Sequence, residues 1–147
     1  MDLLLVNLKL LGWIDRDLRR LPEYCAVVSR ATGIPIPCNY PVVGKDAFET
    51  STGVHAAAIA KAFRKGGYWL ANRVYSGVPA EEVGRKQVIT VGPMSGQANV
   101  VFWLEQHGYS ITHDAVERVL RAAKERDRGL TDEEIEVLLH PAEQARR

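Results

Sequence analysis

Three closely spaced prolines constrain the fold of this chain more than any other feature. Pro35, Pro37 and Pro41 lie in the segment Ile-Pro-Ile-Pro-Cys-Asn-Tyr-Pro-Val-Val at residues 34–43. Each proline removes a backbone donor and holds the residue before it in an extended conformation. The segment therefore cannot form a helix or a central strand, and we predict a semi-rigid arm of polyproline character across residues 34–47. A boundary between packed units is expected at this arm.

Two helices are predicted before the arm. The first covers residues 3–11 and is apolar on nearly every side, which is typical of a helix inside a larger core. Its natural context is therefore expected to extend upstream of Met1. The second helix is capped by Asp15 or Asp17 and ends at Gly33. Its apolar stripe consists of Leu18, Leu21, Cys25 and Val28.

A third helix is predicted after the arm. Hydroxyl side chains at residues 50–52 can cap it, and the glycine pair at residues 66–67 ends it. Its many alanines keep the helix thin, so another backbone or a ligand can approach closely. His55, Ile59 and Phe63 recur at helical spacing, and we therefore expect the imidazole to share a face with two apolar side chains.

The remainder is predicted to contain a short helical turn, one strand and three helices. Pro79 begins the turn, and residues 87–91 form the only convincing strand because they are rich in β-branched residues. The first of the three helices runs to about His107, and apolar residues cover most of its circumference, so we expect it at the centre of the C-terminal core. Thr112 caps the second. A capping box at residues 131–134 starts the last helix.

The predicted fold class is mainly α with a minor β element. Residues 1–33 are assigned to the end of a larger domain, followed by the arm, a small subdomain at residues 48–86 and a helical subdomain at residues 87–147. Pro141 is expected to end the last helix, with a frayed tail beyond it.

Composition excludes several classes of partner. The 147 residues, 46% of them hydrophobic, suit one domain or two small ones. A formal net charge of +1 provides no field for nucleic acid or an anionic membrane, and we predict neither as a partner. Asn7 and Lys9 interrupt the apolar start too early for a signal peptide or a membrane span. Cys25 and Cys38 lack the spacing of a metal site or a disulfide framework, which indicates reduced thiols in a cytoplasmic protein.

His55 is the first candidate for chemistry. At the start of a helix, the positive end of the dipole disfavours the imidazolium and keeps a neutral ring available at neutral pH. A neutral ring can accept a proton or polarise a water. The alternative is that the ring packs beside Ile59 and Phe63 and hydrogen-bonds a loop. From the residues alone, this packing role is the better supported of the two.

Tyr75 and the Ser95-Gly96 pair allow two interpretations each. The phenol of Tyr75 can support His55 or orient a water, or it can cover a core edge while its hydroxyl stays solvated. Ser95 and Gly96 can receive a phosphate on backbone amides at a helix start, or they can simply cap the helix. We assign no chemistry to the remaining histidines, which are His107, His113 and His140.

Four ordered motifs resemble a known enzyme family. They are Pro-Val-Val-Gly-Lys-Asp-Ala-Phe at residues 41–48, Ser-Thr-Gly-Val-His at 51–55, Tyr75 with Pro-Ala-Glu-Glu-Val-Gly-Arg at 79–85, and Gly-Pro-Met-Ser-Gly at 92–96. In this order and spacing they resemble the region after the barrel in 2-isopropylmalate, homocitrate and citramalate synthases. The resemblance covers most of residues 1–108.

The resemblance implies a role inside a larger enzyme. In that family a (β/α)8 barrel binds a divalent metal and catalyses Claisen condensation of acetyl-CoA with a 2-oxo acid, followed by thioester hydrolysis. The region after the barrel reaches over the barrel mouth of the partner subunit. The resemblance thus implies that His55 and Tyr75 are catalytic in a homodimer and that residues 3–11 are the last barrel helix. In such an enzyme the helix start at Ser95 and Gly96 is a candidate site for a phosphate of CoA, with the plain N-cap the better supported role. The metal ligands would lie in a barrel that this sequence lacks, so no metal ligand is predicted in the chain.

Three departures from the family pattern limit what the resemblance predicts. Thr50 and Ser51 replace a histidine and a glutamate, alanines at 56–58 replace Gln-Asp-Gly, and Pro93-Met94 replaces Lys-His. The departures therefore favour the overall condensation chemistry over any particular substrate. The 2-oxo acid is not predicted because its pocket would lie mainly in the barrel, and the identity of the metal stays open. The first hypothesis is a lid and dimerisation part, inactive without its barrel. The alternative is a free-standing helical interaction module that binds a partner through residues 3–11 and the proline arm.

Overall fold

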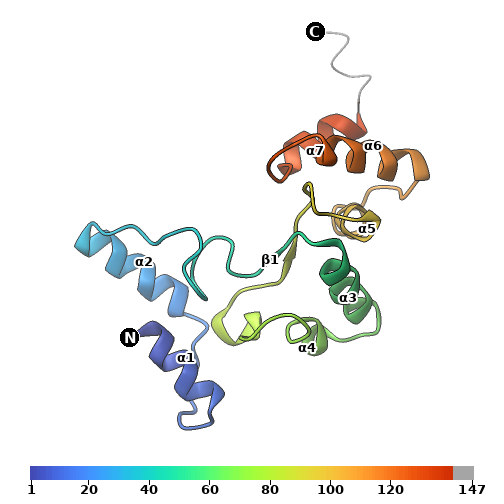
Figure 1. The fold of residues 1–147 in the computed structure, drawn as a ribbon. Helices are drawn as coiled ribbons and strands as arrows, with labels where there is room; N and C mark the ends of the chain where they lie inside the picture. The colour runs from blue at the N-terminus through green and yellow to red at the C-terminus, as the bar shows by residue number, and fades with distance from the viewer. Residues whose placement is uncertain (141–147) are drawn as a thin grey trace. The chain divides into compact units, whose positions relative to one another are not determined.

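The computed structural model describes residues 1–140, which are mainly helical (Figure 1). The elements in chain order are α1 (Asp2–Leu10), α2 (Leu21–Thr32), β1 (Glu49–Thr50), α3 (Gly53–Arg64), α4 (Tyr68–Ala71), the 3-10 helix η1 (Ala80–Val83), β2 (Val88–Ile89), α5 (Gln97–Gln106), α6 (His113–Lys124) and α7 (Asp132–Leu139). The predicted fold class, mainly α with a minor β element, is confirmed. The predicted strand is β2, and its parallel partner β1 was not predicted, because two residues carry no readable alternation.

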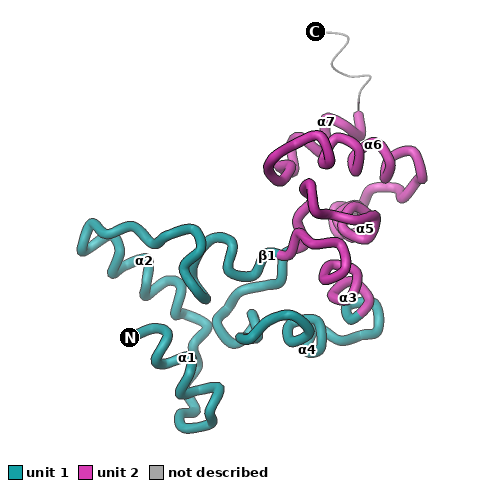
Figure 2. Tube along the Cα trace, in the orientation of Figure 1, with its two compact units in different colours: residues 1–49, 62–88 teal, residues 50–61, 89–147 magenta. Residues whose placement is uncertain are grey.

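The described residues form two compact units (Figure 2). Unit one contains residues 1–49 and 62–88, and unit two contains residues 50–61 and the described residues from Ile89 onward. The chain passes from one unit to the other within β1, α3 and β2. The predicted division at residues 33, 47 and 86 remains a prediction about the domain organisation.

Unit one contains its own apolar core. The buried members of this core are Val6, Leu18, Leu21, Val42, Val43, Phe48, Ala80 and Val83. Helix α1 therefore contributes Val6, and the proline segment contributes two valines. Burying such side chains stabilises each by about 1.5–3 kcal/mol relative to leaving it exposed.

The proline segment is less extended than predicted. From Pro37 onward it folds into consecutive turns, in which the Tyr40 amide donates to the Pro37 carbonyl at 3.0 Å and the Gly44 amide donates to the Tyr40 carbonyl at 2.8 Å. Val42 even adopts a φ of 70°, a conformation that costs a β-branched residue about 1–3 kcal/mol. Burial of Val42 and its neighbour Val43 in the core of unit one offsets that cost.

The start of α2 also differs from the prediction. Arg20 is the N-cap and makes no capping hydrogen bond through its side chain, while Pro22 stands in the first turn, where a missing amide proton costs least. The Asp17 carboxylate does not cap the helix but accepts hydrogen bonds from the Arg19 backbone at 2.9 Å and from its guanidinium. The helix ends as predicted at Gly33, which has a left-handed φ of 71°.

Unit two is built around α5, as its apolar circumference predicts. Its buried core consists of Val91, Val100, Trp103, Leu104, Val116, Val119, Ala123 and Ile135. Both predicted caps are confirmed. The Thr112 hydroxyl accepts a hydrogen bond from the Ala115 amide, and Thr131 and Glu134 form a reciprocal capping box at the start of α7. Pro141 and the predicted frayed tail lie outside the described residues.

The capping box makes unit two sensitive to acid. Hydrogen bonds from the Arg128 side chain and the Thr131 amide lower the pKa of Glu134 from 4.5 to about 2. Because the folded-state pKa is depressed, this stabilisation is fully present above pH 4.5 and is lost as the pH falls toward 2. We expect the thermal midpoint to fall over this range, and less so in Glu134→Gln. The matched control is Glu136→Gln, which removes the same charge from an exposed position of α7 and should leave the acid dependence unchanged.

Candidate functional site

His55 lies in the first turn of α3, in unit two, and its side chain is exposed. One turn further on, Ile59 is 1% exposed, and one turn after that Phe63 is half-buried. The three residues share a helix face, as predicted, but the imidazole lies at the solvent end of that face. An exposed ring at a helix start is accessible to a reactant, whereas the apolar residues below it anchor the helix.

A close backbone approach holds the start of α3. The Gly53 amide donates to the Met94 carbonyl at 3.1 Å, which ties the motif at residues 51–55 to the motif at 92–96. A Cβ atom at Gly53 would lie 2.8 Å from the Gly96 nitrogen, closer than real Cβ contacts. Glycine is therefore required at position 53 because the two backbones are nearly in contact. Two motifs that are about forty residues apart in sequence thus form one structural element.

A polar cluster follows from this contact. It consists of the buried residues Ser95 and Asn99 and the half-buried residues Ser51 and Thr90. Asn99 is 0% exposed, and its amide nitrogen donates to the carbonyls of Ser51 and Thr90, each at 2.9 Å. The Ser95 hydroxyl lies 2.8 Å from the Ser51 carbonyl and accepts a hydrogen bond from the Gly92 amide. Sequence reasoning missed Asn99, although an amide inside the apolar run of α5 is a signal, since buried polar groups need partners.

Gly96 is the N-cap of α5, and the Ser95 hydroxyl binds backbone groups of the segments before the helix. Ser95 is 3% exposed, and its hydroxyl accepts from the Gly92 amide and lies 2.8 Å from the Ser51 carbonyl and 3.3 Å from the Thr90 carbonyl. The Gly96 amide donates to the side-chain oxygen of Asn99 at 3.1 Å, within the cap of α5. This geometry favours the structural alternative of the two interpretations. Contact of these residues with CoA remains a prediction.

Tyr75 lies in unit one and is 50% exposed. The segment that carries it is held on both sides. Arg73 donates to the Glu81 carboxylate at 2.6 Å and lies over the Trp69 ring at 4.7 Å, and the Gln87 amide donates to the Ser76 hydroxyl. The phenol is thus presented at the surface of unit one on a segment with a defined conformation.

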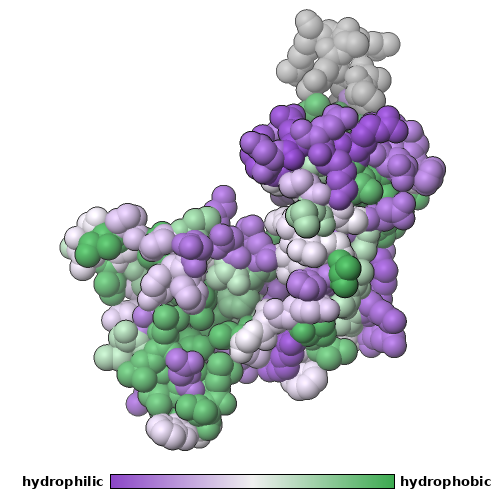
Figure 3. Space-filling view, viewed as in Figure 1, coloured by the Kyte–Doolittle hydropathy of each residue, from purple (hydrophilic) through white to green (hydrophobic). Residues whose placement is uncertain are grey.

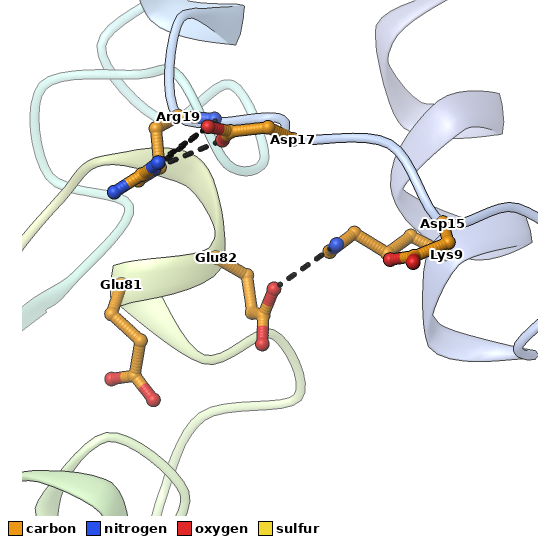
Figure 4. A pocket seen from close by; sticks show the side chains of 6 residues that line it. All are labelled: Lys9, Asp15, Asp17, Arg19, Glu81 and Glu82. Carbon is orange, nitrogen blue, oxygen red and sulfur yellow. Dashed lines mark hydrogen bonds and ion pairs between the residues drawn. The ribbon is translucent and has the colours of Figure 1, made fainter.

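Unit one also contains a charged hollow of about 540 Å³ (Figure 4). It is lined by Lys9, Asp15, Asp17, Arg19, Glu81 and Glu82. Figure 4 shows that several of these groups pair with each other, and Lys9 lies 3.5 Å from Glu82 while Arg19 lies 2.6 Å from Asp17. The Arg19 side chain lowers the pKa of Asp17 to about 2, so this pair stays ionised at neutral pH. These mutual pairings describe a structural ion network.

The resemblance assigns the divalent metal to the barrel rather than to this chain. Within residues 1–140, no three histidine, cysteine, aspartate or glutamate side chains come together to hold an ion. We therefore derive no catalytic step through a metal on this chain. Within the same range, no helix is long and apolar enough to cross a lipid bilayer.

Synthases from archaea are similar to the chain over most of its length. A probable 2-isopropylmalate synthase of Methanopyrus kandleri is 28% identical over 127 residues, which are 85% of this chain and 24% of that protein. A putative (R)-citramalate synthase of Archaeoglobus fulgidus is 30% identical over 131 residues, 87% of this chain and 25% of that protein. A homocitrate synthase of Methanopyrus kandleri is 32% identical over 122 residues, 81% of this chain and 28% of that protein. No family model matches the sequence.

These similarities relate the chain first to a class of synthases. More particularly, the chain is homologous to a region of the 2-isopropylmalate, homocitrate and citramalate synthase family. The resemblance predicted from the four motifs is thus confirmed. The chain spans about a quarter of the length of these relatives.

Proposed function

We propose that this chain is the lid and dimerisation part of an acetyl-CoA-dependent 2-oxo-acid acyltransferase of the 2-isopropylmalate synthase kind. One observation carries the proposal: the similarity to synthases of this family extends over more than four fifths of the chain, 85% and 87% for two relatives. It therefore includes both His55 and Tyr75. In this proposal the partner is a barrel domain of the same or a sister chain, in a cytoplasmic homodimer.

His55 acts in this proposal as a general base delivered from outside the barrel. A neutral imidazole nitrogen takes a proton from the methyl group of acetyl-CoA, and the resulting carbanion attacks the carbonyl carbon of the 2-oxo acid. The imidazolium then gives this proton to the alkoxide formed on the 2-oxo acid, which returns the ring to its neutral form. The neutral ring can next accept a proton from the water that hydrolyses the thioester and pass it to the leaving CoA thiolate. The exposure of the ring supports this role, because a base that serves a substrate held by another domain must project from its own unit.

Tyr75 supplies a hydroxyl in the same proposal. Its phenol can donate a hydrogen bond to the attacking water or to a substrate oxygen and so orient it. The paired side chains of Arg73 and Glu81 support this role, since they hold the surrounding segment in place. The divalent metal and the pocket that selects the 2-oxo acid belong to the barrel.

The proposal is tested by measuring CoA release from acetyl-CoA with a panel of 2-oxo acids. The isolated 147-residue chain is expected to release no CoA above the buffer control. The same chain joined to a family barrel is expected to turn over. Condensation catalysed by the pure chain alone would contradict the proposal, as would a joined protein that is correctly folded and inactive with every 2-oxo acid of the panel.

A second candidate function is a free-standing interaction module, and one observation favours it. Large apolar side chains are exposed on and just after α1, namely Leu4, Leu10, Leu11 and Trp13, with exposed fractions of 54%, 46%, 64% and 75%. Figure 3 shows hydrophobic residues gathering over this part of unit one. Such a surface is typical of a face that another polypeptide covers. A module of this kind would bind a partner without supporting condensation in the joined protein, so the same assay separates the two functions.

A further inference from the structure

We propose that Asn99 is a positioning residue for His55. Its side chain binds the backbone just after β1, which leads into α3, and so fixes the start of that helix. The structural part of this inference stands alone, whereas its consequence for catalysis rests on the proposed function. His55 follows Ser51 by four residues, and the Ser51 carbonyl is one of the two that Asn99 holds. The orientation of the imidazole thus depends on a side chain from a different helix, α5.

The contacts of Asn99 use its amide group fully. One nitrogen donates to the Ser51 carbonyl at the end of β1 and to the Thr90 carbonyl just after β2, both at 2.9 Å. The side-chain oxygen accepts from the Gly96 amide at 3.1 Å. One buried side chain therefore joins three backbone segments that meet at the start of α3, and all of them lie in unit two.

Only an amide of this length satisfies these three groups. A carboxylate of the same shape has no proton to donate, so in Asn99→Asp both carbonyls would lose the Asn99 donor and face a buried negative charge. The single Ser95 hydroxyl, 2.8 Å from the Ser51 carbonyl and 3.3 Å from the Thr90 carbonyl, has only one proton for the two. A hydroxyl is too short to reach all three partners. Because Asn99 is 0% exposed, water cannot replace the lost hydrogen bonds without opening the cluster.

Loss of the Asn99 hydrogen bonds would leave the start of α3 less firmly held. The Gly53 amide is bonded to the Met94 carbonyl, and the Cα atom of Gly96 would lie 3.1 Å from a Cβ at position 53. This close backbone packing needs Ser51 and Gly96 in register, which Asn99 enforces by binding both. When it is lost, the first turn of α3 should fray, and His55 should sample several orientations.

The first test is amide hydrogen exchange of the whole chain, followed by NMR. In Asn99→Asp, we expect the exchange rates of the Gly53 and Ala56 amides to rise about tenfold or more, because each unsatisfied buried group costs the equivalent of about a factor of ten. The His55 ring resonances should shift, whereas amides in the middle of α6 should keep their rates. Unchanged exchange at Gly53 in a folded variant would overturn the inference.

Two further variants make the test specific. Ile135→Val perturbs the fully buried core of unit two on α7, away from the cluster, and should leave the Gly53 amide and the His55 resonances unchanged. Asn99→Ser introduces no charge and serves where Asn99→Asp does not fold, with the same local rise expected. If Ile135→Val produced the same pattern as the Asn99 variants, the effect would be general destabilisation and the positioning role would be wrong.

The catalytic meaning is tested in the chain joined to its barrel. Asn99→Ser should lower kcat by about 10- to 100-fold while the KM for acetyl-CoA changes little, because a displaced base weakens the chemical step more than substrate binding. A rise in KM with unchanged kcat would contradict a positioning role. If exchange at Gly53 rises as expected but His55→Ala keeps full activity, the positioning of the ring stands and the proposed function fails.

Discussion

His55→Ala in the chain joined to its barrel is expected to lower kcat by about 10²- to 10⁴-fold, which is the contribution of a general base. The fall should appear in steady-state CoA release at saturating acetyl-CoA, with the KM values nearly unchanged. Because the side chain is exposed, the free energy of unfolding should change by less than about 0.5 kcal/mol. A catalytic loss without a stability loss would assign the chemistry to the ring itself.

His113→Ala is the matched control for that experiment. His113 is the first residue of α6, so it is also an exposed histidine at the start of a helix in unit two. Its removal should leave kcat within about twofold, since no chemistry is assigned to it. Full activity in His55→Ala, or equal losses in both variants, would show that the catalytic assignment is wrong.

Leu104→Ala is expected to have the largest effect on stability. Leu104 is 0% exposed and lies at the centre of the core of unit two. Removing its three outer carbons leaves a cavity and should lower the free energy of unfolding of unit two by about 2–5 kcal/mol. Urea denaturation monitored by far-UV circular dichroism measures the change, and a value below about 1 kcal/mol would indicate that α5 is not the centre of this core.

Two valines of different burial provide a control for the denaturation experiment. Val119 is 0% exposed and Val137 is 45% exposed, and both lie on helices of unit two. Val119→Ala should destabilise the unit by about 1 kcal/mol or more, whereas Val137→Ala should stay within about 0.5 kcal/mol. Equal losses at the two positions would mean that helix propensity, rather than burial, determines the result.

Helix caps and helix ends could be predicted from the sequence where the residues that form them are close both in sequence and in space. The capping box at Thr131 and Glu134 and the left-handed stop at Gly33 are formed by residues within one turn of each other. Their hydrogen bonds need no distant partner, so composition and spacing are enough to predict them. The apolar circumference of α5 was readable for the same reason.

Elements that depend on distant partners were predicted poorly. Strand β1 (Glu49–Thr50) forms because it pairs with β2, which lies about forty residues later in the sequence. Next to this pair, the Thr90 amide donates to the Thr50 carbonyl at 3.0 Å. The proline segment turns back on itself because Val42 and Val43 reach a core built by α1 and α2. Burial outweighed the local preference of the prolines, and no local pattern predicts burial by a remote partner.

The sequence by itself determined the helical class, the main helix ends and the four motifs that relate the chain to 2-isopropylmalate, homocitrate and citramalate synthases. It also placed His55 at the start of a helix. Only the tertiary structure decided what holds that start in place, because the contacts of Asn99 with Ser51 and Thr90 join residues 48 and 9 positions apart. Hydrogen bonds of this kind depend on how the chain packs, since a buried amide binds whichever backbone groups the fold brings within reach.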